Sequence, residues 1–304
     1  MSRKTQQKVE IELVGGLGNQ LFGYFAGAYY AEIFNKRLIV DLTQVSLGLT
    51  NHGSELTSFK LSKSYELIRS KPRGFARLIK RIFDKLSIKF KFIKYFRYKL
   101  LGVYQSKEVG FDSFLEKQSE ISRIQGYYQT WKYVDNLQEL GADISLEIIN
   151  PSNWFLELQI EINKAKPIAI HVRRGDYKNP NSPVGLLSRS YYQDAIGVVN
   201  NKYGNRNFWI FSDHMEDSQK LLNGLVPKNS NWVCPPTGSD PAESLVLMSL
   251  SKVIIIANSS FSWWAAKTGV EKELVIAPTP WFKTLESPSY LIPNSWNQVK
   301  SSWM

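Results

Sequence analysis

Hydrophobic and polar positions alternate along the chain in blocks that predict strands and helices in turn. Residues 9–14 fit a strand, glycines follow at 15, 16 and 18, and residues 20–34 form an apolar helical block before a second strand at 37–41. This order predicts two parallel strands joined by a helix. Residues 43–63 are rich in Ser, Thr, Asn and Gly, and we expect a loop there.

A second series begins near residue 167, with apolar strands at 167–172, 207–212, 252–257 and 273–278 and helices between them. Asp240 is expected to cap one helix, with Pro241 at its first position and Glu243 completing a capping box. Trp263 and Trp264 fit packing between a helix and the sheet. Alternating strands and helices predict an α/β fold with parallel sheets. We expect two Rossmann-like domains that face a cleft, one formed by residues 1–150 and the other by residues 151–304. The boundary between them is expected within residues 150–166, which begin with an Asn-Pro-Ser-Asn interruption of the pattern.

The chain has 304 residues, enough for two domains of average size, and one cysteine, Cys234, so an internal disulfide is impossible. The three histidines are scattered, so a structural zinc site is not expected. The first residues lack the apolar core of a signal peptide, and no stretch approaches the roughly 20 apolar residues that span a bilayer. We therefore expect a cytoplasmic protein.

The net charge of +11 is concentrated in residues 71–99, which hold eleven Lys and Arg against one acid. Basic residues interleaved with aromatic ones are typical of a segment that contacts anionic lipid, so peripheral attachment to the inner membrane is one hypothesis. An amphipathic helix packed on its own domain is the plainer explanation. A nucleic-acid-binding segment is a third, although the charge is confined to one stretch.

Polar side chains follow the strands of the second series. In an open parallel sheet, ligands bind outside the carboxyl ends of the strands. Arginine forks match phosphate oxygens, a helix start with hydroxyls binds anions, and a carboxylate suits a guanine edge. Each pattern also has an ordinary structural use, in salt bridges or helix caps, but together they predict a nucleoside diphosphate site. Its members are Arg173, Arg174 and Asp176 after the first strand, Asp213 after the second, and Asn258, expected as a helix cap, with Ser259 and Ser260 after the third.

The first glycine turn imitates a dinucleotide fingerprint, because Asp41 ends the following strand. The third glycine is missing, however, since position 21 is Leu21. The turn instead carries Asn19 and Gln20, two amides suited to sugar hydroxyls, so a nicotinamide or flavin dehydrogenase is the weaker hypothesis. No Asp-x-Asp triplet stands at a strand end to hold a divalent metal, and arginine is expected to replace it.

Five blocks of the sequence resemble the ordered signature of the bacterial alpha-1,2-fucosyltransferases, glycosyltransferase family 11. They are GGLGNQLF at 15–22, GYYQ at 126–129, HVRRGDY at 171–177, FSD at 211–213 and NSSFSWW at 258–264. They span almost the whole chain in the family's order. One departure is Gly23, where members commonly have glutamine, and it leaves the acceptor side of the comparison open.

This resemblance implies a GT-B-like fold and metal-independent, inverting transfer of L-fucose from GDP-fucose to the 2-hydroxyl of a galactoside. The product would belong to a surface glycan such as O-antigen, and the acceptor could be lipid-linked; another GDP-sugar donor is an alternative. The only carboxylate within the third block belongs to Asp176, which is the candidate general base. The equally weighted alternative is that Asp176 serves only to hold Arg174 in place. Carried over by position, Arg173 would contact the β-phosphate, His171 would contact the nucleotide and Asp213 would contact the guanine. Ser259, Ser260 and Phe261 would line the diphosphate. Asn19 and Gln20 would lie near the transferred sugar.

Overall fold

The computed structural model describes residues 6–46, 56–61, 65–68, 100–106, 109–175, 182–204 and 206–304. The basic segment 71–99 and Asp176 lie outside them. Two compact units divide the chain. The first contains Met1–Ser54, Leu61–Ile144 and Pro288–Leu291, and the second contains Glu55–Lys60, Ser145–Ser287 and Ile292–Met304. The expected ranges 1–150 and 151–304 did not foresee that the first unit takes Pro288–Leu291 from the second half of the chain, or that the second unit takes Glu55–Lys60 from the first half.

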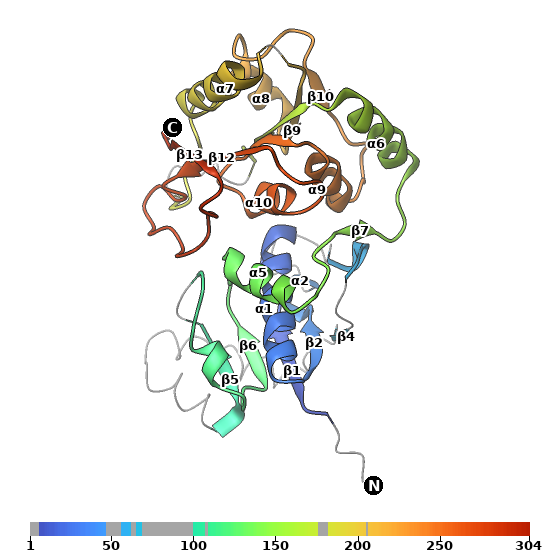
Figure 1. Ribbon diagram of the computed structural model, residues 1–304, viewed down its shortest axis with the longest axis vertical. Helices are drawn as coiled ribbons and strands as arrows, with labels where there is room; N and C mark the ends of the chain where they lie inside the picture. The colour runs from blue at the N-terminus through green and yellow to red at the C-terminus, as the bar shows by residue number, and fades with distance from the viewer. Residues whose placement is uncertain are drawn as a thin grey trace. The chain divides into compact units, whose positions relative to one another are not determined.

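The first unit is built on a parallel five-stranded sheet in the order β4-β2-β1-β6-β5. Its strands are β1 (Lys8–Glu12), β2 (Arg37–Asp41), β4 (Tyr65–Ile68), β5 (Val103–Gln105) and β6 (Arg123–Gln125). Helix α1 (Leu17–Ile33) connects β1 to β2, as the sequence predicted, and α5 (Trp131–Glu139) packs beside it (Figure 1).

Helix α1 approaches β1 closely because glycines face the strand. A Cβ on Gly23 would lie 2.7 Å from Leu13 Cδ2, and one on Gly27 would lie 2.9 Å from Ile11. At Gly27 the contacted atoms are Cβ and Cγ2 of Ile11, so a larger side chain there would push the helix off the sheet. At Gly23 the contacted atom is the end of the Leu13 side chain, which would have to move to admit a larger residue.

The second unit is built on a parallel six-stranded sheet in the order β10-β9-β8-β11-β12-β13. Its strands are β8 (Ile168–Val172), β9 (Phe208–Ser212), β10 (Asn231–Val233), β11 (Val253–Ile255), β12 (Leu274–Thr279) and β13 (Asn297–Lys300). Helices α7 (Arg189–Tyr203) and α8 (Met215–Leu222) lie on one side of this sheet, and α9 (Pro241–Ser249) and α10 (Ser260–Lys267) on the other (Figure 1). All four strands expected in this half are present.

Two local features were not predicted. Part of the expected loop 43–63 is ordered, as α2 (Thr43–Ser46), a 3-10 turn (Leu56–Ser58) and β3 (Phe59–Lys60), which pairs with β7 (Glu147–Ile148) in the second unit. The expected boundary region 150–166 contains α6 (Asn153–Ala165), because Ser152 caps a helix there by accepting a bond from the Phe155 N–H.

The start of α9 follows the sequence prediction only in part. Asp240 caps the helix by accepting from the Ala242 N–H at 2.9 Å. Glu243 does not complete a capping box, because its buried carboxylate accepts from the Ser152 N–H at 2.6 Å and the Ser152 hydroxyl at 2.9 Å. It thus ties the start of α6 to α9, a contact that the local sequence pattern could not reveal.

Buried aromatic side chains fill the space between sheet and helices. Trp263 and Trp264 are fully buried in α10, as expected, and their rings meet edge to face 5.1 Å apart. On the opposite face, Tyr191 and Tyr192 of α7 join the core formed by β8, β9, β11 and β12. In the described part of the chain, no helix is long and apolar enough to cross a membrane.

Candidate active site

Arg173 and Asp213 come together where β8 and β9 end. Arg173 Nε lies 3.1 Å from Asp213 Oδ2, and the Asp213 carboxylate also accepts from the backbone N–H groups of Arg174 at 2.8 Å and Gly175 at 2.9 Å. Both side chains are about four-fifths buried, with 19% and 22% of their surface exposed. Parallel neighbours β8 and β9 place their ends side by side, so this contact follows from the sheet order.

The turn after β8 depends on the small size of Gly175. A Cβ at this position would lie 2.8 Å from Asp213 Oδ2. A side chain here would therefore displace the carboxylate that the Arg174 and Gly175 N–H groups bind. Asp213 fixes both the backbone of this turn and the direction of the Arg173 side chain.

His171 lies beneath the turn as a neutral ring. It is 3% exposed, and its ring lies 5.6 Å from that of Phe261 on α10 with 31° between the planes. Burial, with a smaller contribution from the charge of Arg173, lowers the pKa of His171 to about 3. His171 Nδ1 has no hydrogen-bond partner among the described residues. The ring can therefore offer hydrogen bonds or apolar contact, but not a positive charge at neutral pH.

The start of α10 differs from the predicted cap. Ser259 is the N-cap residue, and its side chain makes no capping hydrogen bond. The Asn258 amide, expected as the cap, instead donates to the carbonyl oxygens of Val184 and Gly185, each at 3.1 Å. Asn258 therefore holds the 184–185 loop beside β11. A helix start without a side-chain cap leaves first-turn N–H groups available for an anion.

Arg174 points to a different environment from Arg173. It is 4% exposed, and its Nη1 lies 3.0 Å from the Met304 sulfur. Among the described residues, its Nε and Nη2 have no hydrogen-bond partner. Burial lowers the pKa of Arg174, while Tyr192, Asp217 and Asp213 favour its charge. A charged guanidinium in this position adds positive potential beneath the turn.

Asn19 and Gln20 belong to the first unit. Gln20 is fully buried and its amide donates to the Gly15 carbonyl at 3.2 Å, so it holds the glycine turn. Asn19 Oδ1 accepts from Gln129 Nε2 at 2.8 Å. The first two sequence blocks of the resemblance therefore meet at the end of the first sheet. The structure joins His171, Arg173, Asp213 and Phe261 in the second unit, with Ser259 and Ser260 beginning the same helix as Phe261.

A polar cluster that the sequence did not indicate lies on the first sheet. Arg123 reaches Glu10 at 2.6 Å, Glu12 at 2.5 Å and Asp41 at 2.6 Å. Only the strand order β2-β1-β6 brings these residues together. No group of His, Cys, Asp and Glu in the described ranges has the geometry to hold a metal ion.

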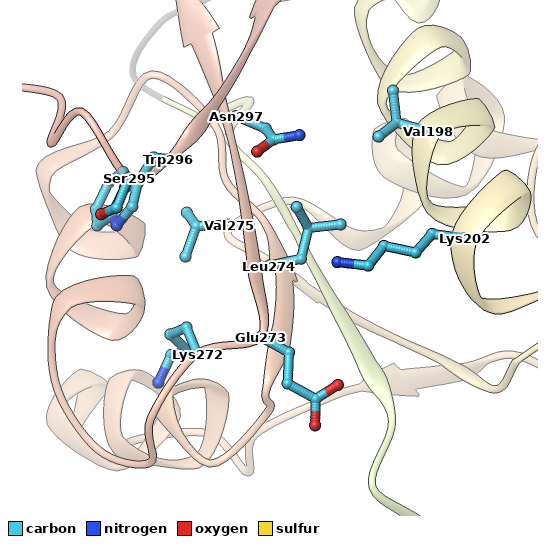
Figure 2. Close-up of a pocket in the computed structure, with 9 residues that line it drawn as sticks. All are labelled: Val198, Lys202, Lys272, Glu273, Leu274, Val275, Ser295, Trp296 and Asn297. Atoms are coloured by element: carbon cyan, nitrogen blue, oxygen red, sulfur yellow. The ribbon is translucent and has the colours of Figure 1, made fainter.

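A separate cavity of about 230 Å³ opens at the other end of the second sheet (Figure 2). Leu274 and Asn297, which line it, are the first residues of β12 and β13, so the cavity lies at the amino ends of the strands. Lys202 of α7 extends toward it (Figure 2). It is therefore distinct from the Arg173 and Asp213 site at the carboxyl ends.

Comparisons with known proteins agree with the five sequence blocks. The model of glycosyl transferase family 11 matches residues 8–296. An Escherichia coli alpha-1,2-colitosyltransferase is 30% identical over 306 residues, covering 96% of this chain and 99% of the relative. The E. coli O-antigen biosynthesis glycosyltransferase WbnK is 26% identical, covering 93% and 98%.

Solved structures show the same fold at low identity. The fucosyltransferase NodZ from Bradyrhizobium superposes with a TM-score of 0.52 at 12% identity, covering 94% of this chain and all of NodZ. Arabidopsis thaliana FUT1 in complex with GDP gives 0.51 at 13% identity, covering 96% and 76%. With parallel sheets in both units and a family match across nearly its whole length, the chain is a GT-B-like enzyme that belongs to glycosyltransferase family 11.

Proposed function

We propose that this glycosyltransferase moves L-fucose from GDP-fucose to the 2-hydroxyl of a galactoside acceptor during synthesis of a surface glycan such as O-antigen. The functions named for the two E. coli relatives, an alpha-1,2 transfer and O-antigen biosynthesis, support this assignment. NodZ, an alpha-1,6-fucosyltransferase solved after soaking with GDP-fucose, has the same fold.

The observation that carries the proposal is the fixed arginine beside an uncapped helix start. Arg173 is held by Asp213 at the end of β8, and α10 begins at Ser259, whose own side chain makes no capping hydrogen bond. A guanidinium and the free N–H groups of a helix start are both well suited to bind phosphate oxygens. The same unit supplies a neutral, buried imidazole at His171 against Phe261.

The reaction needs charge stabilisation more than covalent catalysis. The C1–O bond to the β-phosphate breaks, and its electron pair leaves with GDP. The acceptor oxygen attacks C1 from the opposite face, which inverts the configuration, and its proton passes to a base. Arg173 and the α10 N–H groups would stabilise the charge that grows on the leaving diphosphate, and stabilisation of this kind usually contributes most to such catalysis. Asp176, outside the described residues, is the proposed base because it is the only carboxylate within the third sequence block; its alternative role is to hold Arg174.

Replacing Arg173 by alanine tests this role. We expect kcat to fall by about 10²- to 10³-fold, because a preorganised donor to a developing charge is worth that much. Isothermal titration with GDP and a melting curve separate lost binding from lost folding. Arg206→Ala removes an exposed arginine of the same unit and serves as the matched control. If Arg173→Ala keeps full activity, the proposed site is wrong.

We also propose that no divalent metal takes part. Rates measured after treatment with EDTA should then equal those of the untreated enzyme. A large loss that manganese restores would contradict this part of the proposal and leave the donor assignment standing.

The relative that is 30% identical favours a second donor, GDP-colitose. Colitose is L-fucose without its 3-hydroxyl. A site that hydrogen-bonds that hydroxyl would reject the deoxy sugar by a factor of about 10⁴, whereas a site without such a contact discriminates weakly. Comparing kcat/KM for GDP-fucose, GDP-colitose and GDP-mannose, with NMR of the product linkage, decides between the donors.

Membrane contact remains a proposal of its own. A lipid-linked acceptor would make the basic segment 71–99 useful at an anionic surface, at about 1 kcal/mol per charge. Flotation with anionic vesicles at low salt should carry the protein upward, and deletion of the segment should abolish this. If the protein does not float with such vesicles, the segment has another role.

A further inference from the structure

Exposed aromatic and apolar side chains gather at the carboxyl end of the first sheet. Val109 follows β5 and Tyr127 follows β6, and they are 39% and 45% exposed. Tyr290, from the returning segment Pro288–Leu291 of the first unit, is 50% exposed. The part-buried Phe111 and Trp131 pack against Tyr290 and complete this group, which we call the aromatic rim. In an open parallel sheet, this end is where ligands bind.

The fold holds the rim in place by unusual means. Tyr128 adopts a left-handed backbone at φ 53° and is fully buried, with its hydroxyl donating to the Gln125 carbonyl at 3.0 Å. Tyr290 is also left-handed at φ 58°, and its carbonyl accepts from the Thr130 hydroxyl and the Trp131 N–H, each at 3.0 Å. Each such backbone costs about 1 kcal/mol for a residue other than glycine. Strain of this kind is concentrated where side chains must face a ligand.

The rings are fixed as well as exposed. Tyr290 meets Trp131 at 6.0 Å and Phe111 at 6.1 Å, with planes almost perpendicular in both pairs. The Lys132 ammonium lies 3.5 Å from the Tyr290 ring centroid and 4.6 Å from that of Phe111. These contacts restrict the rotation of Tyr290 before any ligand arrives, which lowers the entropy lost on binding.

An amide pair adjoins the rim. Gln129, 9% exposed, lies two residues before Trp131 and donates from Nε2 to Asn19 Oδ1 at 2.8 Å. This bond engages one end of each amide and fixes the orientation of both. Tyr127, two residues before Gln129, adds an exposed ring at the same end of the sheet.

We propose that the aromatic rim and the Asn19–Gln129 pair bind the terminal galactosyl ring of the acceptor glycan. This inference rests on the proposed function and adds a location and residues for the acceptor. The axial 4-hydroxyl of galactose leaves the C3, C4 and C5 hydrogens together on one apolar face, which packs on aromatic rings. The hydroxyls around the ring edge match the alternating donors and acceptors of two side-chain amides. A surface that binds another protein would not require two side-chain amides held in one orientation.

The test measures acceptor binding without the donor. Lactose and N-acetyllactosamine are the probes, with saturation-transfer NMR for contact and titration for affinity. For Tyr127→Ala and Tyr290→Ala we expect the dissociation constant of the better probe to rise about 3- to 10-fold, the usual worth of one aromatic contact. The affinity for GDP should stay within twofold. Tyr290→Phe keeps the ring and should bind like the wild type, and Ile160→Ala removes an exposed apolar side chain of the second unit as the matched control.

Several results would overturn the proposal. The first is an unchanged probe affinity in both alanine variants, and the second is the absence of probe binding by the wild type. The third is a wild-type dimer that both variants dissociate, because the rim would then be an interface between two copies of the chain. Should Tyr290→Ala fail to fold, Tyr127→Ala still decides. If GDP does not bind the wild type, the proposed function fails, and the probe titrations still show whether the rim is a galactoside site.

Discussion

Replacing Asp213 by asparagine separates two roles for this residue. The resemblance to the family implies contact with guanine, whereas the structure shows the carboxylate accepting from Arg173 Nε at 3.1 Å and from the N–H groups of Arg174 and Gly175 at 2.8 and 2.9 Å. Asparagine keeps one acceptor oxygen and places an NH₂ group against one of these donors. At least one backbone N–H loses its partner, and Arg173 loses its counter-charge.

The magnitude follows from these bonds. Charge-assisted hydrogen bonds are worth about 1.5–3 kcal/mol. Because about one-fifth of the Asp213 side chain is exposed, water replaces part of this, and we expect a loss of about 1–2 kcal/mol in unfolding free energy. For a unit of this size, the melting temperature should fall by about 2–8 °C. An Arg173 displaced by about 1 Å should lower kcat/KM by about 10- to 100-fold.

The decisive measurement is base selectivity. Inosine diphosphate lacks the 2-amino group that a carboxylate would bind. If Asp213 orients the turn and Arg173, Asp213→Asn weakens binding of GDP and of inosine diphosphate by the same factor, so their ratio is unchanged. If the ratio of the affinities for GDP and inosine diphosphate instead falls toward one in Asp213→Asn, this reasoning is refuted and Asp213 contacts the guanine. Asp217→Asn removes an equal charge from the first turn of α8 and controls for electrostatics.

Three further changes test the packing around the site. Burial lowers the pKa of His171 to about 3 from its ordinary 6.5, so the folded state binds fewer protons than the unfolded state at pH values between these two. The unfolding free energy measured in urea titrations should therefore drop by about 2 kcal/mol from pH 7 to pH 5. His171→Phe should reduce this dependence on pH. Glu243→Ala leaves a part-buried backbone N–H without its acceptor and should cost about 1–3 kcal/mol in the same assay, and a cost near zero would contradict the bond. Gly269→Ala should cost more than Gly238→Ala in melting curves, because both positions are left-handed but only at Gly269 would a Cβ overlap Ser249; equal losses would count against the close approach.

Short-range patterns in the sequence were sufficient for the longer strands of both sheets. Strand β2 was predicted at its observed ends, and β8, β9, β11 and β12 were found within three residues, because buried parallel strands are short apolar runs between polar turns. Strands β6, β10 and β13 were not recognised. They are three or four residues long and carry polar or mixed side chains, which leaves no periodic signal.

The sequence by itself determined the family, the alternating α/β order and the placement of Arg173, Asp213 and Ser259 after successive strands, since these depend on residue order and local propensity. Tertiary structure alone decided what each polar group contacts. It turned the Asp213 carboxylate toward the 173–175 turn, moved the cap of α10 from Asn258 to Ser259 and brought Tyr290 beside Trp131. Such partners are set by strand order and by contacts between segments that are far apart in the sequence, and no local pattern records which of several possible acceptors a buried donor will meet.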